Sequence, residues 1–116
     1  MKYLFILNEA PYGTERSYNA LRLAGSLGKK DDVEVKMFLM GDAASCAKKG
    51  QKVPQGYYNV EVMLKNVIRN NSEIGVCGTC MEARGITDQE LIEGTSHSTL
   101  DALSNMTIWA DKVLVF

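Results

Sequence analysis

Short apolar runs separated by longer helical stretches form the main pattern of this chain. Residues 3–7 are apolar without interruption, which is typical of a strand that is covered on both faces of a parallel sheet. We assign further strands to three other short segments: residues 34–40, 74–76 and 112–116. The pattern alone therefore predicts four strands.

Helical spacing predicts the segments between these strands. In residues 15–27 the apolar side chains recur every three or four positions, and Gly28 supplies a C-terminal stop. Asn59 is a suitable cap for residues 60–68, which show the clearest amphipathic pattern of the chain. We expect a last helix to begin within residues 98–101, where Ser and Asp favour a helix start.

Two further segments carry local signals. Residues 87–90 read Thr-Asp-Gln-Glu, a capping box that predicts a short helix toward Ile92. Residues 41–58 are the least regular part of the chain, and within them we expect one helical turn at 42–48. A connection this long inside a compact domain is typical of a functional segment or an interface.

The alternation of strand and helix predicts one domain, residues 1–116, with the α/β fold class. Parallel strands need such crossovers, and right-handed crossovers give a three-layer α/β/α sandwich. Ligands of these sheets bind beyond the carboxyl ends of the strands. The loops expected there are residues 8–14, 41–58 and 77–87.

Composition argues against several classes of function. Thirteen Lys and Arg residues against 14 Asp and Glu give a net charge of −1, which argues against a nucleic-acid or membrane partner. No apolar run reaches the roughly 20 residues that cross a bilayer, and the N-terminus does not resemble a signal peptide. Three cysteines without an export signal favour a reducing compartment. We therefore expect a cytoplasmic protein.

The strongest chemical signal is the Cys77-Gly78-Thr79-Cys80 sequence, which directly follows a predicted strand. If a helical turn begins at residues 80–84, backbone amides point toward the sulfur of Cys77, and Arg84 adds positive charge. Both features lower a cysteine pKa and create thiolate at neutral pH. Cys80 is near enough to attack an adduct on Cys77. The pair suits persulfide transfer, disulfide chemistry or half of a metal site.

Three specific alternatives are weaker. A thioredoxin-like site needs a cis-proline downstream of the cysteines, but Pro11 and Pro54 both precede them. A flavin or nucleotide phosphate would meet two acidic residues and a single glycine in the loop at 8–15, which contains no phosphate-binding motif. A zinc site would need Cys46 and His97 beside the cysteine pair, although neither belongs to a second close-spaced pair. We predict no cofactor and no metal.

Several stretches of the chain resemble the DsrE/DsrF-like superfamily, and within it a YchN-like branch. The resemblance spans essentially the full length, and the Cys-x-x-Cys-x-x-x-Arg-Gly run is its most specific part. The matching stretches are NEAPYG at 8–13, FLMGDA at 38–43, GQK at 50–52, GY at 56–57, CGTCMEARGI at 77–86 and ADKVL at 110–114.

The resemblance implies a five-stranded parallel sheet between helices, assembled as a homotrimer or as a hexamer of two trimers. In sulfur-relay members, a cysteine at the end of the third strand accepts sulfur as a persulfide and passes it to a partner protein. By position that residue corresponds to Cys77. This chain differs in having Cys80 as well, and a resolving cysteine would convert a persulfide to a disulfide with release of sulfide.

Other candidate residues surround this centre. Arg84 is expected to stabilise the Cys77 thiolate, and Asn8 to hydrogen-bond backbone near the thiols. Tyr12 is expected either to line the pocket or to pack across a subunit interface, where tyrosine is enriched. The substrate-binding set is completed by four motif residues: Gly13, Gly78, Thr79 and Gly85.

Two functional hypotheses remain open from the sequence. The first is a homo-oligomeric sulfur-handling protein, in which Cys77 accepts sulfur from a donor protein and Cys80 is the resolving thiol. The second is a non-catalytic oligomeric binding protein, whose interface or loop at 41–58 recognises a small ligand or another protein.

Overall fold

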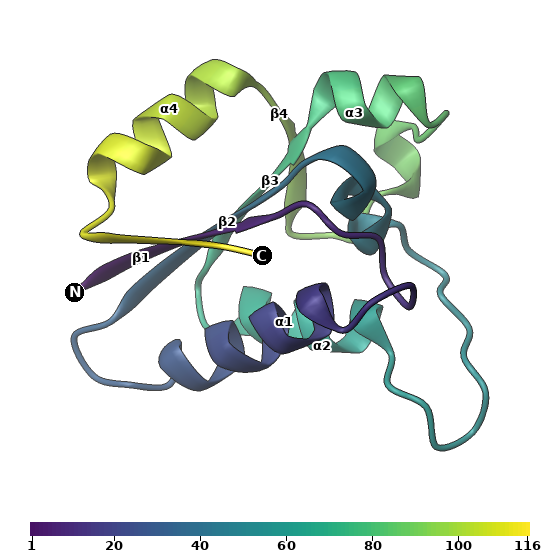
Figure 1. Cartoon of the computed structure of the whole chain (residues 1–116), viewed down its shortest axis with the longest axis horizontal. Coiled ribbons are helices and arrows are strands. Elements are labelled where there is room, and N and C mark those ends of the chain that lie inside the picture. The colour runs from purple at the N-terminus through teal and green to yellow at the C-terminus, as the bar shows by residue number, and fades with distance from the viewer.

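A computed structural model describes all 116 residues and contains one five-stranded parallel sheet. The strand order is β4-β3-β2-β1-β5, so β2 is the central strand and β3 and β1 flank it (Figure 1). Register pairs such as Phe5 with Met37 and Met37 with Ile74 keep the central strands aligned. The strands are β1 (Lys2–Leu7), β2 (Glu34–Leu39), β3 (Glu73–Cys77), β4 (Thr95–Ser98) and β5 (Lys112–Val115).

Helices cover the two faces of the sheet unequally. α1 (Arg16–Leu27) and α2 (Val60–Arg69) pack side by side on one face, whereas α4 (Leu100–Trp109) lies on the other (Figure 1). The short helix α3 (Gly78–Ala83) continues from the end of β3. This arrangement confirms the predicted three-layer α/β/α sandwich with a five-stranded parallel sheet.

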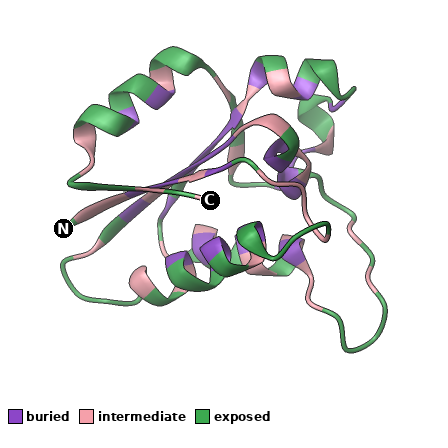
Figure 2. Ribbon diagram, viewed as in Figure 1, coloured by how far each residue is buried: buried purple, intermediate pink, exposed green.

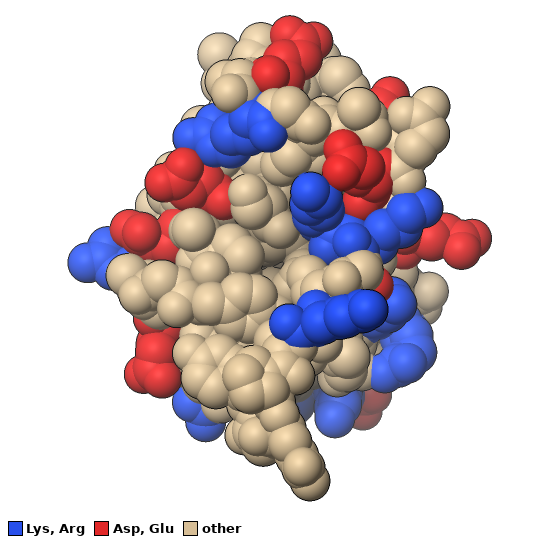
Figure 3. Space-filling model, turned by 90° about the vertical axis from the view of Figure 1, so that its right-hand side faces the viewer, with Lys and Arg blue, Asp and Glu red and all other residues tan.

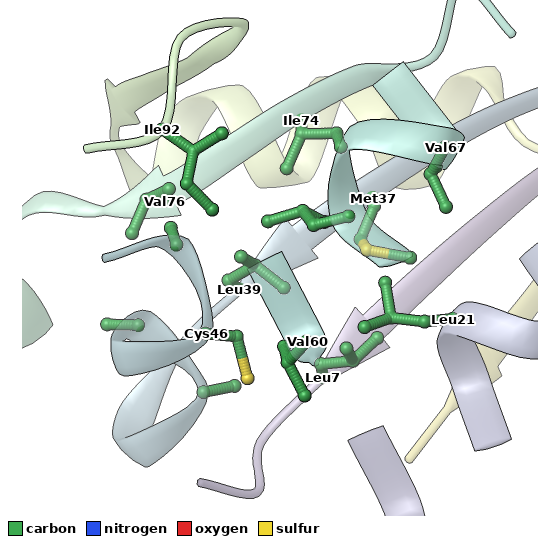
Figure 4. Close-up of a cluster of buried hydrophobic side chains, with 14 of the residues drawn as sticks. Leu7, Leu21, Met37, Leu39, Cys46, Val60, Val67, Ile74, Val76 and Ile92 are labelled. Carbon is green, nitrogen blue, oxygen red and sulfur yellow. The ribbon is translucent and has the colours of Figure 1, made fainter. Parts of the chain in front are cut away.

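The main core lies between the sheet and the α1–α2 layer. Twenty-one buried residues form it, and Figure 4 shows Leu7, Met37 and Leu39 from the strands meeting Leu21 and Val60 from the helices. Only four residues form the buried cluster beneath α4. Figure 2 shows this contrast as continuous burial along the central strands and mostly exposed surface on α4. The α4 side is therefore the thinly covered face.

The four predicted strands are all present, and β4 is the one that the apolar pattern missed. Its sequence is Thr-Ser-His-Ser, with no apolar side chain, because it pairs only with β3 at the sheet edge. An edge strand needs backbone pairing and little burial. Ser98, expected at a helix start, therefore ends β4, and Thr99 caps α4 by accepting the Ala102 N–H at 3.2 Å.

The predicted capping box at 87–90 is present and opens a short helix, but this is a 3₁₀ helix, η2 (Asp88–Glu90), which ends before Ile92. Leu91 is already extended, and the Ile92 N–H donates to the carbonyl of Ala47 at 2.8 Å. Leu91 and Ile92 are both buried in the main core. Their packing there, in an extended conformation, ends the helix at Glu90.

The segment at 41–58 begins with a 3₁₀ helix, η1 (Gly41–Ala47), followed by a loop that extends from the body of the molecule (Figure 1). The carboxylate of Glu61 anchors this loop by accepting the N–H groups of Gly50 and Gln51 at 2.8 and 2.9 Å. Asn59 caps α2 as predicted, accepting from the Val62 N–H.

None of the helices combines the length and the apolar character that a membrane span requires.

Candidate functional site

Cys77 occupies the junction of a buried strand and a helix. It is the last residue of β3 and the N-cap of α3, and its sulfur accepts the backbone N–H of Cys80 at 3.4 Å. The hydroxyl of Thr79 lies 3.3 Å from the same sulfur. The predicted approach of helix amides to this thiol is therefore present for Cys80, although α3 begins at Gly78 rather than at residue 80.

Hydrogen bonding makes Cys77 the more acidic thiol of the pair. Burial raises its pKa, but hydrogen bonds from the Cys80 thiol, the Thr79 hydroxyl and the amides of both residues outweigh this and lower the pKa overall. All three cysteines are free thiols, and Cys77 is partly accessible. This is the environment that a nucleophilic thiolate requires.

Cys80 contacts the loop that follows β2. The N–H of Gly41 donates to the Cys80 sulfur at 3.1 Å. Gly41 has a φ of 56°, a conformation that favours glycine, and this turns the backbone after β2. Burial and the neighbouring Cys77 thiol raise the pKa of Cys80, against the Gly41 amide and the Arg84 charge, which lower it. The two thiols are thus unequal.

Arg84 lies beside Cys80 and η1. Its guanidinium donates to the carbonyl of Cys80 at 3.1 Å and twice to one carboxylate oxygen of Asp42, at 3.1 and 2.8 Å. The Arg84 charge is one of the causes that lower the pKa of Cys80. The hydrogen bonds of its guanidinium go to the Cys80 carbonyl and to Asp42, and its expected support for the Cys77 thiolate stays a prediction.

Glycine occupies two positions of the motif, 78 and 85, for different structural reasons. A Cβ built on Gly78 would lie 2.0 Å from Nε2 of His97, so the imidazole ring occupies the side-chain space at the start of α3. Gly85 has a φ of 65° and ends α3: its N–H donates to Glu82, and the Ile86 N–H donates to Met81. This is a Schellman stop, which fixes where Arg84 leaves the helix.

The residues of the first loop lie further from the thiols. Asn8 bonds the carbonyl of Phe116 through its side chain, at 3.3 Å, and its own carbonyl is next to Gly41. The hydroxyl of Tyr12 accepts the Val60 N–H at 3.1 Å and donates to Gln51. Gly13 is exposed in the same loop. The side-chain hydrogen bonds of Asn8 and Tyr12 thus go to the C-terminal residue, the start of α2 and Gln51, and not to either sulfur.

Tyr12 belongs to an aromatic cluster within the chain. Its ring lies 5.6 Å from that of Tyr58, which in turn lies 4.3 Å from Tyr18 and 4.7 Å from Tyr57. The cluster joins the first loop, α1 and the end of the loop at 48–59. Tyr57 remains about half exposed.

The residues considered for zinc are not brought together. Cys46 is fully buried in the main core, where desolvation raises its thiol pKa to about 12, and it is 3.7 Å from the carbonyl of Glu9. His97 bonds Asp88 through Nδ1 at 2.8 Å. No group of three or more cysteine, histidine or acidic side chains in the chain has metal-binding geometry.

Figure 3 shows the side of the molecule on which α3, η1 and the loop at 48–59 lie, and basic and acidic side chains are interspersed over it. Lys48 pairs with Glu90 at 3.2 Å, as Arg84 does with Asp42 at 2.8 Å. The lysines that follow η1 therefore do not form a purely basic surface.

Sequence reasoning gave no role beside the cysteine pair to Gly41, Asp42 and Asp88, and it considered His97 only as a zinc ligand. Gly41 and Asp42 come from the loop after the neighbouring strand, at a sequence distance that no local motif reveals. His97 is on the strand that the apolar pattern did not detect. The one available signal was the rule that loops at the carboxyl ends of adjacent parallel strands meet.

Comparison with known proteins identifies the family. A model of the DsrE/DsrF-like family matches residues 1–116. The chain belongs to this family. Protein YchN from Escherichia coli strain K12 is 40% identical over 116 residues, covering 99% of this chain and 98% of that protein. The uncharacterized protein MJ0989 of Methanocaldococcus jannaschii is 39% identical over the full length of both.

Solved structures agree with this assignment. The crystal structure of the ychN protein from Escherichia coli matches with a TM-score of 0.94 and 39% identity, covering 100% of this chain and 99% of that one. The Methanobacterium thermoautotrophicum protein MTH1491, at 10% identity and a TM-score of 0.74, shares the fold. The predicted membership, including its YchN-like character, is confirmed. The DsrE-like family is linked to sulfur relay.

Proposed function

We propose that this protein handles sulfur through Cys77, which accepts a sulfane sulfur as a persulfide, with Cys80 as the resolving thiol. The observation that carries the proposal is the hydrogen bonding of the Cys77 sulfur at the β3–α3 junction, with a lowered pKa on a partly accessible thiol. Family membership supports the same chemistry. The reaction would take place in the cytoplasm, where thiols stay reduced.

In the first step, the Cys77 thiolate attacks the outer sulfur of a donor persulfide. A new S–S bond forms on Cys77, the donor S–S bond breaks, and the donor leaves as a thiolate. An acceptor thiolate then takes the outer sulfur by the same exchange and regenerates the Cys77 thiolate. Donor and acceptor proteins are the partners that this cycle requires.

Cys80 offers a second outcome for the persulfide. Its thiolate attacks the inner sulfur of Cys77, a Cys77–Cys80 disulfide forms, and hydrosulfide leaves with the outer sulfur. The two thiols together supply the two electrons that reduce sulfane sulfur to sulfide, and an external dithiol returns the pair to the reduced state. Because the pKa of Cys80 is raised, only a small fraction of this thiol is thiolate at neutral pH, which slows the step.

Intact-mass measurement of reduced protein mixed with a low-molecular-weight persulfide tests the proposal. We expect one added sulfur on Cys80→Ser, no stable adduct on Cys77→Ser, and a disulfide with released sulfide on the wild type. Cys46→Ala is the matched control, since that thiol is buried and should leave the pattern unchanged. Unreactive native thiols at 77 and 80 would contradict the proposal and favour the non-catalytic binding protein.

We also propose that the chain assembles with copies of itself through the thinly covered face. Leu100 and Ile108 on α4 are 72% and 83% exposed, and Val115 on the edge strand β5 is 65% exposed. These exposed apolar side chains of α4 and β5 are the candidates for a contact surface. Sedimentation should give a trimer or hexamer. Ile108→Glu should weaken this assembly, whereas the control Thr107→Ser should leave it unchanged. A monomer at micromolar concentration would contradict this proposal.

A further inference from the structure

A separate groove of about 590 Å³ lies between α1 and α2. Its basic residues lie at the carboxyl-terminal half of both helices: Arg22 is in α1, Lys29 directly follows its C-cap, and Arg69 is in α2. Helices of a parallel α/β sheet run against the strands, so this half lies toward the amino ends of the strands. The groove is therefore at the other end of the sheet from the cysteine pair.

The groove is cationic and mostly polar. Three basic side chains line it, no acidic residue does, and only two of its nine lining residues are hydrophobic. None of the three forms an ion pair. Arg22 instead donates to the side chain of Asn19 at 3.2 Å, and Arg69 to that of Asn66. Three positive charges thus share one concave surface in a chain with a net charge of −1.

The helix dipoles offset only part of this positive charge. The carboxyl ends of α1 and α2 each carry about half a negative charge, so the two ends offset about one of the three cations. About two positive charges remain. That matches one phosphate group, which carries about −1.5 to −2 at neutral pH.

Gly25 provides an independent indication that the hollow is used. It lies inside α1 and lines the groove, and a Cβ at this position would have no atom within 4 Å. Glycine destabilises a helix interior relative to alanine, and the bond that the Gly25 carbonyl accepts from the Asn70 side chain at 3.5 Å does not require a glycine, because the space at its Cβ is open. The structural consequence of Gly25 is the open floor of the groove.

We propose that this groove binds a phosphorylated small molecule, with Arg22, Lys29 and Arg69 around the phosphate. The volume suits a ligand of nucleotide size. The guanidinium groups of the two arginines match phosphate oxygens, and the amides of Asn66 and Asn70 add polar contacts beside them.

Calorimetric titration with AMP, ribose 5-phosphate and adenosine tests this inference on the intact protein. We expect saturable binding of at least one phosphorylated compound, with adenosine at least tenfold weaker and affinity falling as salt rises. Arg69→Gln should weaken binding about tenfold. Lys65→Gln, which alters a paired cation of α2 outside the groove, should leave the affinity unchanged. The test is independent of the persulfide reaction.

Gly25→Leu separates a ligand site from accidental charge. The substitution fills the groove floor without removing a cation, so binding should weaken at least tenfold while thermal stability is kept or increased. The inference is overturned if neither phosphorylated compound saturates, if Lys65→Gln weakens binding as much as Arg69→Gln, or if Gly25→Leu binds like the wild type. A change of oligomeric mass in Gly25→Leu would also overturn it, by making the groove a contact between copies.

Discussion

Arg84 ties the cysteine helix to the neighbouring strand's loop through Asp42. Its Nη2 and Nε atoms both donate to one oxygen of Asp42, at 2.8 and 3.1 Å, while Nη1 donates to the carbonyl of Cys80. The adjacent residue, Gly41, donates its N–H to the Cys80 sulfur. One loop thus contacts Cys80 twice, by its amide directly and through Arg84, and both contacts favour the thiolate of Cys80.

Removing the Arg84 charge should therefore act on Cys80. In a Cys77→Ala background, Arg84→Gln should raise the pKa of Cys80 and slow its alkylation at neutral pH about two- to fivefold, the range of a partly exposed charge. Stopped alkylation followed by mass spectrometry measures the rate. Arg16→Gln, which breaks an exposed pair with Glu9, is the control. An equal effect on Cys77 in a Cys80→Ala background would contradict this assignment.

The hydroxyl of Thr79 should control the acidity of Cys77. Thr79→Val keeps the shape of the side chain but loses the hydrogen bond to the sulfur, so the pKa of Cys77 should rise. A higher pKa means less thiolate at neutral pH, and alkylation should slow about two- to fivefold, the effect of one hydrogen bond. Above the thiol pKa the two rates should converge. Thr79→Ser should restore the wild-type pH profile; a profile that Thr79→Val does not shift would refute the role.

Local signals made the strand-to-cysteine junction predictable. β3 is short and mostly apolar, so the place of Cys77 at a strand end follows from a few neighbouring residues, although α3 begins two residues earlier than expected. β4 was not predictable in this way. Its polar side chains are exposed at the sheet edge, and only backbone pairing with β3 defines the strand.

The partners of Cys80 show the limit of sequence reasoning more clearly. Gly41 and Arg84 are 43 residues apart (84 minus 41). Both contact Cys80, because β2 and β3 are adjacent in the sheet. The motif alone placed Arg84 near the pair, but it gave no sign of Asp42, which turns the guanidinium toward η1. Direction depends on tertiary contacts that the spacing does not encode.

The His97 ring should oppose a side chain at Gly78. In Gly78→Ala, the new Cβ would meet Nε2 of His97 at 2.0 Å, so the partly exposed ring must move and its bond to Asp88 is weakened or lost. Because the ring can move into solvent and alanine favours a helix over glycine, we expect a loss of about 1 kcal/mol or less in the free energy of unfolding. Urea denaturation measures it. Gly13→Ala, with no atom within 4 Å of the new Cβ, is the matched control.

A double-mutant cycle then tests the cause. His97→Ala removes the ring, so Gly78→Ala should cost much less in that background, and the coupling energy should be clearly non-zero. Equal costs in both backgrounds would show that His97 does not set the requirement for glycine.

The buried thiol of Cys46 should make the protein less stable in alkali. Its pKa is raised to about 12 in the folded state, against about 8.5 for an unfolded cysteine. The unfolded chain thus releases this proton at lower pH than the folded one, so the stabilising contribution is complete below pH 8.5 and falls as pH rises toward 12. Between pH 8 and pH 10 the expected loss is about 2 kcal/mol. Urea unfolding at the two pH values should show this loss in the wild type and not in Cys46→Ala, because every other titrating group is common to both; parallel pH profiles would contradict it.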